Sequence, residues 1–228
     1  MESHIERYFV EGLAHASYLV VNGPHAVVVD PKRDIDDYIA FARSKDSEIV
    51  AILNTHPHAD FASGFQELAG LTGASIHTSH LAPVTYDHTP SRDGDIIKFG
   101  DAQIRILETP GHSPDSLSFL LEEDEKPVAI FTGDLLFVGD VGRPDLRDAD
   151  EDPDLLAKKL YDSLFNKVMN LPDEVLVLTA GADVQKDRVE VDVIGWGIAE
   201  ESWGIEHRTI YGDPEKLEVW KSLDDFLT

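Results

Sequence analysis

The stretch NTHPHADFASG, residues 54–64, places His56, His58 and Asp60 at alternate positions of one short loop. The loop ends an apolar run, EIVAILNTH, that predicts a buried strand, and it leads into a predicted helix over residues 61–73. Rigid strands of α/β proteins often present reactive groups on such strand-to-helix loops. The stretch therefore predicts an α/β fold with its chemistry at the ends of strands.

The composition of the 228-residue chain fits a soluble globular protein with one large core or two small ones. Its 19 basic and 44 acidic residues give a formal net charge of -25, which disfavours a nucleic-acid partner because basic groups bind phosphate backbones. Neither a signal peptide nor a membrane span is indicated, so we expect a cytoplasmic protein without a membrane partner. Because cysteine is absent, the chemistry must use histidines, carboxylates, hydroxyls or a metal ion.

The hydrophobic pattern predicts the remaining elements of the chain. Three strands precede residue 31, and an amphipathic helix follows over residues 34–46 with Asp34 as its N-cap. Four strands lie between residues 95 and 134, and a long helix over about residues 153–170 precedes a strand over residues 175–181. Beyond residue 180 the pattern predicts two antiparallel strands and a final helix from Asp213.

Two further loops offer metal ligands, each directly after an apolar strand. His112 lies in PGHS and Asp134 lies in FTGD. Imidazole and carboxylate groups suit zinc and non-haem iron, and rigid strand ends hold such ligands within the tolerance of a metal site. A lone histidine is more often structural, but three loop tips that each offer a ligand favour a shared site.

These motifs resemble the metallo-β-lactamase superfamily, whose metal motif is H-x-H-x-D-H followed by a distant histidine and a distant aspartate. The match is HPHADF, PGHS and TGD. The resemblance implies an αββα sandwich, here with an incomplete or substituted second half and a C-terminal β-hairpin plus helix. Members with two metals use a histidine where Phe61 stands and another after a late strand, where LTAGAD has none. We therefore expect one metal ion per chain.

Within the superfamily, residues 5–178 resemble the persulfide dioxygenases, particularly those fused to rhodanese domains, through TPGHSPDSLSF and FTGDLLFVGDVGRPDL. The resemblance implies one Fe(II), with zinc as the alternative, held by His56, His112 and Asp134. It also implies catalytic supporting roles for His58 and Asp60, which would orient the ligands by hydrogen bonds. The implied reaction converts a low-molecular-weight thiol persulfide, such as glutathione persulfide, and O2 to sulfite and thiol.

Several alternatives stay open on the sequence. A metal-dependent hydrolase of the glyoxalase II type would attack a thioester, and a catalytically silent chimera would keep only the fold. Arg143 is a candidate for binding the carboxylates of the thiol carrier, but a pair with Asp140 or Asp145 would instead fix its loop. His58 is either a supporting group or a brace of its loop.

The last fifty residues resemble a different family. LTAGADVQKDRVEVDVIGWG is similar to the start of the nuclease domain in phage terminase large subunits, where Asp183 matches an acidic metal ligand. We accordingly predict a metal-binding domain over residues 1–178 and a terminase-like segment over residues 179–228. The other nuclease ligands would fall beyond residue 228, so we expect a structural segment. It would pair with the open sheet edge or with another chain, as in a homodimer.

Overall fold

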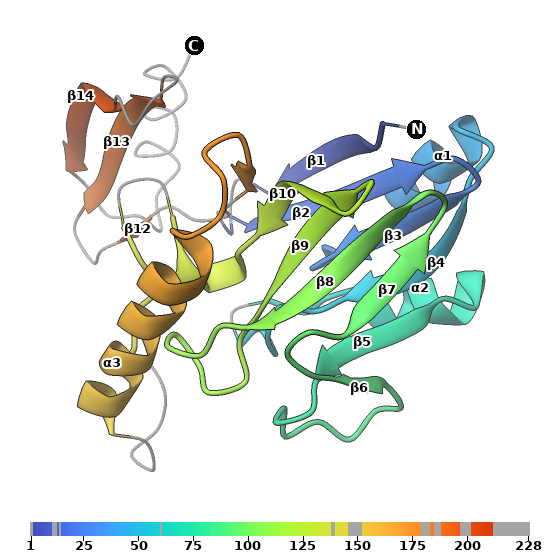
Figure 1. Ribbon diagram of the computed structural model, residues 1–228, viewed down its shortest axis with the longest axis horizontal. Coiled ribbons are helices and arrows are strands. Elements are labelled where there is room, and N and C mark those ends of the chain that lie inside the picture. Colours follow the sequence, from blue (N-terminus) through green and yellow to red (C-terminus); the bar gives the residue numbers. More distant parts are fainter. Residues whose placement is uncertain are drawn as a thin grey trace.

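The computed structural model describes residues 2–10, 13, 15–59, 61–137, 140–145 and 152–178, and the backbone of residues 183–184, 188–196 and 202–211. Two packed sheets form the body of the molecule (Figure 1). The strands of the first sheet, in spatial order, are β1 (His4–Val10), β2 (His15–Asn22), β3 (His25–Val29), β4 (Glu48–Leu53), β5 (Ser75–Ser79) and β6 (Thr89–Ser91). The strands of the second sheet are β11 (Leu176–Leu178), β10 (Lys126–Phe131), β9 (Leu117–Glu123), β8 (Ala102–Glu108) and β7 (Ile96–Phe99).

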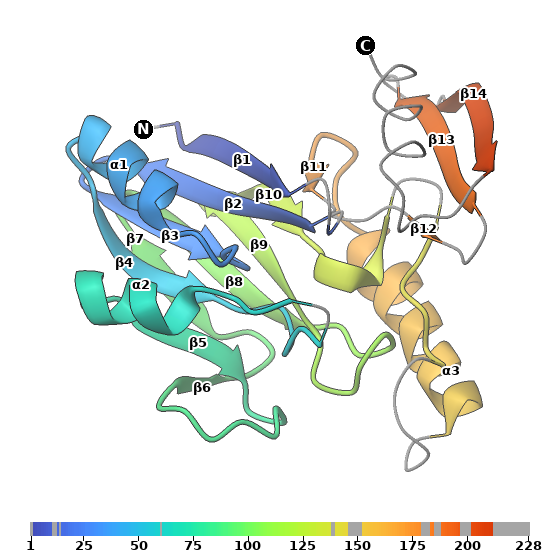
Figure 2. The ribbon, with the colours of Figure 1, turned by 180° about the vertical axis from the view of Figure 1, so that it is seen from behind.

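Helices cover the outer faces of both sheets. The helices α1 (Asp36–Ser44) and α2 (Phe65–Thr72) lie against the first sheet, as Figure 2 shows from behind. The helix α3 (Pro153–Ser163), continued by a π-helical turn (Leu164–Val168), packs against the second sheet. The order of layers is helix, sheet, sheet, helix, so the expected αββα sandwich is confirmed.

Alternation of side chains along each strand produces three apolar layers. Val20 and Leu53 point between the sheets, where they meet Phe119 and Phe131 of the second sheet. Their chain neighbours Leu19 and Ile52 point the other way, under α1 and α2. Leu120 and Ile130 likewise pack under α3. Because both faces of the central strands are buried, these strands read as continuous apolar runs, and each large buried side chain stabilises the fold by about 1.5–3 kcal/mol.

Some predicted boundaries are wrong. Asp34 does not cap α1, because Ile35 occupies the cap position and no side chain bonds there. The helix predicted from residue 61 begins only at Phe65, and Gly64 N just before it bonds to Lys32 O (3.1 Å) in the loop between β3 and α1. The short strands β5 and β6 were not predicted. The long helix is confirmed, and its N-cap is Asp152, whose side chain accepts a bond from Asp154 N (3.0 Å).

The tail forms a separate antiparallel sheet of β12 (Asp183–Val184), β13 (Arg188–Trp196) and β14 (Ser202–Tyr211). The predicted pair of strands is therefore confirmed, while the predicted final helix lies outside the described residues. β11 still belongs to the second sheet, where it pairs with β10 in parallel. Among the described residues, no helix has the length and apolar character needed to cross a membrane.

Candidate metal centre

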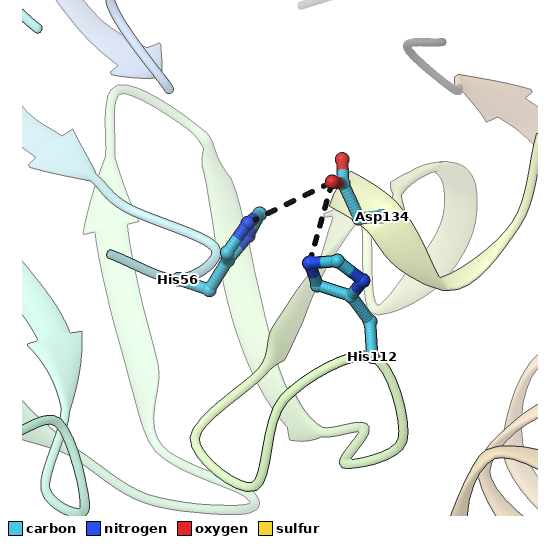
Figure 3. Close-up of side chains that lie close together, drawn as sticks. All are labelled: His56, His112 and Asp134. Carbon is cyan, nitrogen blue, oxygen red and sulfur yellow. Dashed lines mark ion pairs between the residues drawn. The ribbon is translucent and has the colours of Figure 1, made fainter. Parts of the chain in front are cut away.

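Three loops carry the candidate ligands to one place. His56 follows β4 of the first sheet, while His112 follows β8 and Asp134 follows β10 of the second sheet. Their side chains converge from these separate elements (Figure 3). The prediction that these three residues lie together is confirmed, and they are the one group of this kind among the described residues.

The distances within this group suit a metal ion. Asp134 Oδ2 lies 3.7 Å from His56 Nε2 and 3.5 Å from His112 Nε2, and all three donor atoms lie within 4.8 Å of one another. For metal–ligand bonds of about 2.1 Å, adjacent donors are about 3.0 Å apart in octahedral and about 3.4 Å apart in tetrahedral geometry. The two histidine–aspartate distances exceed the tetrahedral value by only a few tenths of an ångström. Two imidazoles and one carboxylate are also a donor set that iron and zinc accept.

The three ligands differ in how far solvent reaches them. The side chain of His56 is only 4% exposed and that of His112 is 13% exposed, whereas that of Asp134 is 32% exposed. The site is therefore open mainly on the side of Asp134. A substrate approaching from that side would reach the space between the three donors.

Glycines allow the ligand loops to approach one another. Gly133 precedes Asp134 with φ +53°, and a Cβ there would lie 2.6 Å from Thr55 Oγ1. A Cβ on Gly142 would lie 1.7 Å from the carbonyl oxygen of Asp134 and 3.0 Å from Cβ of His112. The carbonyl oxygen of Asp134 belongs to the backbone, so it cannot rotate away from a Cβ at residue 142 as a side chain could. Gly142 is thus a residue of the site that the sequence reasoning missed, although the glycine-containing motif GDVGRPD pointed to its loop.

A buried carboxylate lies beneath the first loop. Asp30 directly follows β3 in the left-handed conformation (φ 45°) and accepts bonds from Thr55 N (2.8 Å) and Thr55 Oγ1 (2.7 Å). Burial alone would raise the pKa of Asp30, but the nearby His58 and the bonds from Thr55 hold it below its usual value. Asp30 was also missed, although a polar residue directly after the apolar run AVVV is the same signal that identified Asp134.

The supporting groups predicted from the resemblance have different outcomes. His58 Nε2 lies 3.3 Å from Asp30 Oδ1, and its donor atoms do not join the group of three. Asp60 lies outside the described residues. Arg143 forms a two-point pair with Asp145 (2.7 and 3.1 Å), and both side chains are largely exposed. The loop-fixing pair that was one alternative for Arg143 is therefore present.

Phe61 occupies the neighbourhood in which the motif would place another histidine. Its ring lies 4.1 Å from the ring of His15 and 4.6 Å from that of His58, measured between centroids. The ring of His58 lies in turn 4.2 Å from that of His56. Phe61 therefore adds an apolar surface beside the ligand loop, where a histidine would add a donor.

Comparison with known proteins identifies the family. A model described as "Metallo-beta-lactamase superfamily" matches residues 10–180. The chain belongs to the metallo-beta-lactamase superfamily. Members bind metal ions, iron or zinc, which agrees with the donor set of His56, His112 and Asp134.

Similar proteins within the superfamily have different names and activities. The hydroxyacylglutathione hydrolase of Francisella tularensis subsp. novicida (strain U112) is 31% identical over 173 residues, which are 75% of this chain and 64% of that protein. The crystal structure of a metallo-beta-lactamase from Staphylococcus aureus subsp. aureus COL shares 32% identity with a TM-score of 0.72, over 78% of this chain and 56% of that one. The crystal structure of ETHE1 from Myxococcus xanthus shares 29% identity with a TM-score of 0.68, over 82% of this chain and 78% of that one. The chain thus spans 64% of the length of the curated relative named above.

A second family model, described as "Terminase large subunit gpA, endonuclease domain", matches residues 147–228. This match bears out the resemblance of the tail, but it begins well before residue 178 and overlaps the superfamily match. The segment from α3 to β11 therefore matches both models. The division into domains at residue 178 stays a prediction.

Proposed function

We propose that this chain is a mononuclear non-haem iron persulfide dioxygenase. The reaction takes a thiol persulfide, O2 and water to thiol, sulfite and two protons, which balances atoms and charge. The proposed substrate is a low-molecular-weight thiol persulfide of the glutathione type. His56, His112 and Asp134 hold the iron in this proposal.

The position of Phe61 carries the proposal. Superfamily members with two metals are expected to have a histidine there, and here an apolar ring packs on His15 and His58 instead. His58 itself faces the carboxylate of Asp30. Among the described residues three donors are gathered, which supports a site for one ion.

The donor set also favours oxygen chemistry. Two histidines and one carboxylate on one side of an Fe(II) ion leave positions at which a sulfur donor and O2 meet, whereas zinc supports hydrolysis only. In this chain, buried His56 fixes the closed side of the site, and half-exposed Asp134 borders the open side. The apolar ring of Phe61 packs beside the ligand loop. These features suit a substrate that enters from the side of Asp134.

An oxygen electrode tests this proposal directly. Iron-loaded protein given glutathione persulfide should consume O2 and release sulfite in equal amounts, and protein loaded with zinc should do neither. The variant Asp134→Ala, prepared and loaded in the same way, is the control for uncatalysed persulfide decay. Oxygen uptake that is equal for the iron-loaded, zinc-loaded and variant proteins would refute the proposal.

A thioester hydrolase is the second candidate, because the curated relative at 31% identity is a hydroxyacylglutathione hydrolase. The same preparation, given an acylated glutathione thioester, distinguishes the two. Hydrolysis by the zinc form without oxygen uptake would assign the site to this candidate.

We further propose that Arg143 binds the carboxylates of the thiol carrier after its pair with Asp145 opens. Such exposed pairs contribute only about 0–1 kcal/mol, so a substrate carboxylate competes with Asp145 at small cost. Arg143→Ala should raise KM with little change in kcat. Asp145→Asn should leave KM unchanged or lower it, and a raised KM in that variant would show that the pair itself is required.

A further inference from the structure

The loop that carries His112 rests on the helix α3. In Figure 1 and, from behind, in Figure 2, α3 lies beside the loop between β8 and β9. A bond from Thr109 N to Ser116 O (2.9 Å) closes the base of this loop, and Gly111 N bonds to Ser113 O (3.1 Å) next to the ligand. Because both bonds lie within the loop, they shape it but do not fix its place relative to the other ligand loops.

Two polar side chains of the helix and its π-helical turn bond to the backbone just before the ligand. Ser163 Oγ donates to the carbonyl oxygen of Pro110 (2.8 Å), and Lys167 Nζ donates to the carbonyl oxygen of Glu108 (2.8 Å). Lys167 Nζ also bonds to Asp93 Oδ1 (2.6 Å), which in turn accepts a bond from Glu108 N (2.8 Å). The chain that leads into the ligand is therefore held from α3.

Gly111 brings the loop directly against the helix. A Cβ there would lie 2.5 Å from Cα and 2.9 Å from Cγ of Leu160, so only glycine permits this approach. Leu160, Ser163 and Lys167 follow one another at about one turn of the helix, and side chains at this spacing share a face. Leu160 and Ser163 are buried. One face of α3 therefore contacts the loop up to the residue that precedes His112.

The outer side of α3 is largely exposed. Tyr161, Phe165 and Met169 are 58%, 47% and 61% exposed, whereas Leu156 and Leu164 face the second sheet. An element with few buried contacts opens more easily than a central strand of the core. Contacts that tighten when a metal ion fixes the ligand loop would therefore have a measurable effect on the stability of α3.

We propose that α3 positions His112 for metal binding through Ser163 and Lys167, and that a bound metal ion in turn stabilises α3. Ser163 and Lys167 are positioning residues, since neither joins the group of donor atoms. The two effects are the two directions of one coupling, so they have the same size. This inference rests on the metal-binding part of the proposed function, but it does not depend on the dioxygenase reaction.

Four variants separate this coupling from a general loss of stability. Ser163→Ala removes the hydroxyl, and Lys167→Met removes the ammonium group but keeps a long apolar stem. Ser47→Ala is the matched control for the first, because Ser47 is also buried and its hydroxyl bonds to a backbone carbonyl, that of Gly23 (2.7 Å) in the turn between β2 and β3. Lys45→Met, at the end of α1, is the matched control for the second. The side chain of Lys167 is 35% exposed, so Lys167→Met should fold even if Ser163→Ala does not.

Two measurements require no turnover. Competition with a chelator gives the affinity for zinc(II), and hydrogen exchange of the α3 amides with and without saturating zinc(II) gives the stability of the helix. In the wild type we expect zinc(II) to slow exchange in α3 by about tenfold. Ser163→Ala and Lys167→Met should each weaken zinc binding by about 3- to 10-fold and reduce the slowing of exchange by the same factor. This loss is smaller than the roughly 10- to 100-fold typical of groups that bond to a ligand itself, because these two bond to the chain before it.

The two control variants should stay within about twofold of the wild type in both measurements. Exchange in α3 that does not respond to zinc(II) in the wild type would overturn the inference, as would wild-type affinity in both Ser163→Ala and Lys167→Met. An equal loss in Ser47→Ala would show a general effect of a lost bond and would overturn it as well. A protein that passes these tests but whose iron form consumes no O2 would refute the dioxygenase proposal alone.

Discussion

Replacing Gly142 with alanine should damage the metal centre without unfolding the protein. The new Cβ would lie 1.7 Å from the carbonyl oxygen of Asp134, 2.9 Å from its carbonyl carbon and 3.0 Å from Cβ of His112. Heavy atoms in ordinary contact are about 3.5 Å apart, so the backbone at Gly142 must move away from that of Asp134, in the same loop, by more than about 1 Å. Metal sites tolerate deviations of only about 0.2 Å in ligand distances.

From this displacement we expect at least about tenfold weaker metal binding, which corresponds to about 1.4 kcal/mol. Chelator competition with zinc(II) measures the affinity, and thermal unfolding of the metal-free protein measures the stability. The melting temperature should fall only slightly, because the clash is confined to the loop from Asp134 to Gly142 and to the neighbouring His112. Most of the apolar core lies elsewhere, between the sheets.

Gly70→Ala is the matched control, since a Cβ on Gly70 in α2 meets nothing within 4 Å. It should leave metal affinity unchanged and stabilise the helix by up to about 1 kcal/mol. Wild-type affinity in Gly142→Ala would refute the close approach of Gly142 to Asp134. An equal loss in both variants would show that the effect is not local.

Three other predictions concern the ligands, the buried carboxylate and the tail. His112→Ala should remove nearly all bound metal, because the two ligands left rarely hold a divalent ion. Elemental analysis of metal per chain measures this loss. Full metal occupancy in the variant, or a two-metal centre, would contradict the proposed site. The folded pKa of Asp30 lies below its unfolded value of about 3.9, so its contribution to stability is present above that pH and is lost as the pH falls through the lower folded value. Unfolding titrations below about pH 4 should therefore show a smaller pH dependence for Asp30→Asn than for wild type. Deleting residues 181–228 should lower the melting temperature or solubility, whereas Asp183→Ala should change neither metal content nor oxygen uptake; magnesium-dependent DNA cleavage abolished by Asp183→Ala would contradict a structural tail.

The sequence was informative wherever a local pattern decides the structure. Residues such as Val20, Val28 and Ile52 lie in continuous apolar runs because both faces of their strands are buried, and such runs are visible without a structure. The three ligand-bearing loops were found for the same reason, since each directly follows such a run. Loops at strand ends of the two sheets then meet at one site, as the resemblance implied.

Contacts between distant segments were not readable in the same way. The pairing of His58 with Asp30 joins residues 28 positions apart, and no periodicity links them. The strand β5 carries exposed and half-buried polar residues such as Ser75 and His77, so its pattern is weak, although it pairs with β4. Asp34 fits the composition of an N-cap, but the backbone enters α1 one residue later, at Ile35. In each case tertiary packing outweighs local preference.

Phe61 shows why the change of one residue cannot be understood as the loss of one ligand alone. Its ring contacts His15 and His58, so the space of a second-metal ligand is filled by an apolar group that a metal ion does not bind. His58, one of these two histidines, already faces the carboxylate of Asp30 through Nε2. The same carboxylate accepts a bond from Thr55 Oγ1, which also lies 3.1 Å from His56 Nδ1. His56 is thus the histidine of this loop whose Nε2 faces Asp134, and the packing of Phe61 and the bonds of Asp30 both fit the proposed site for a single ion.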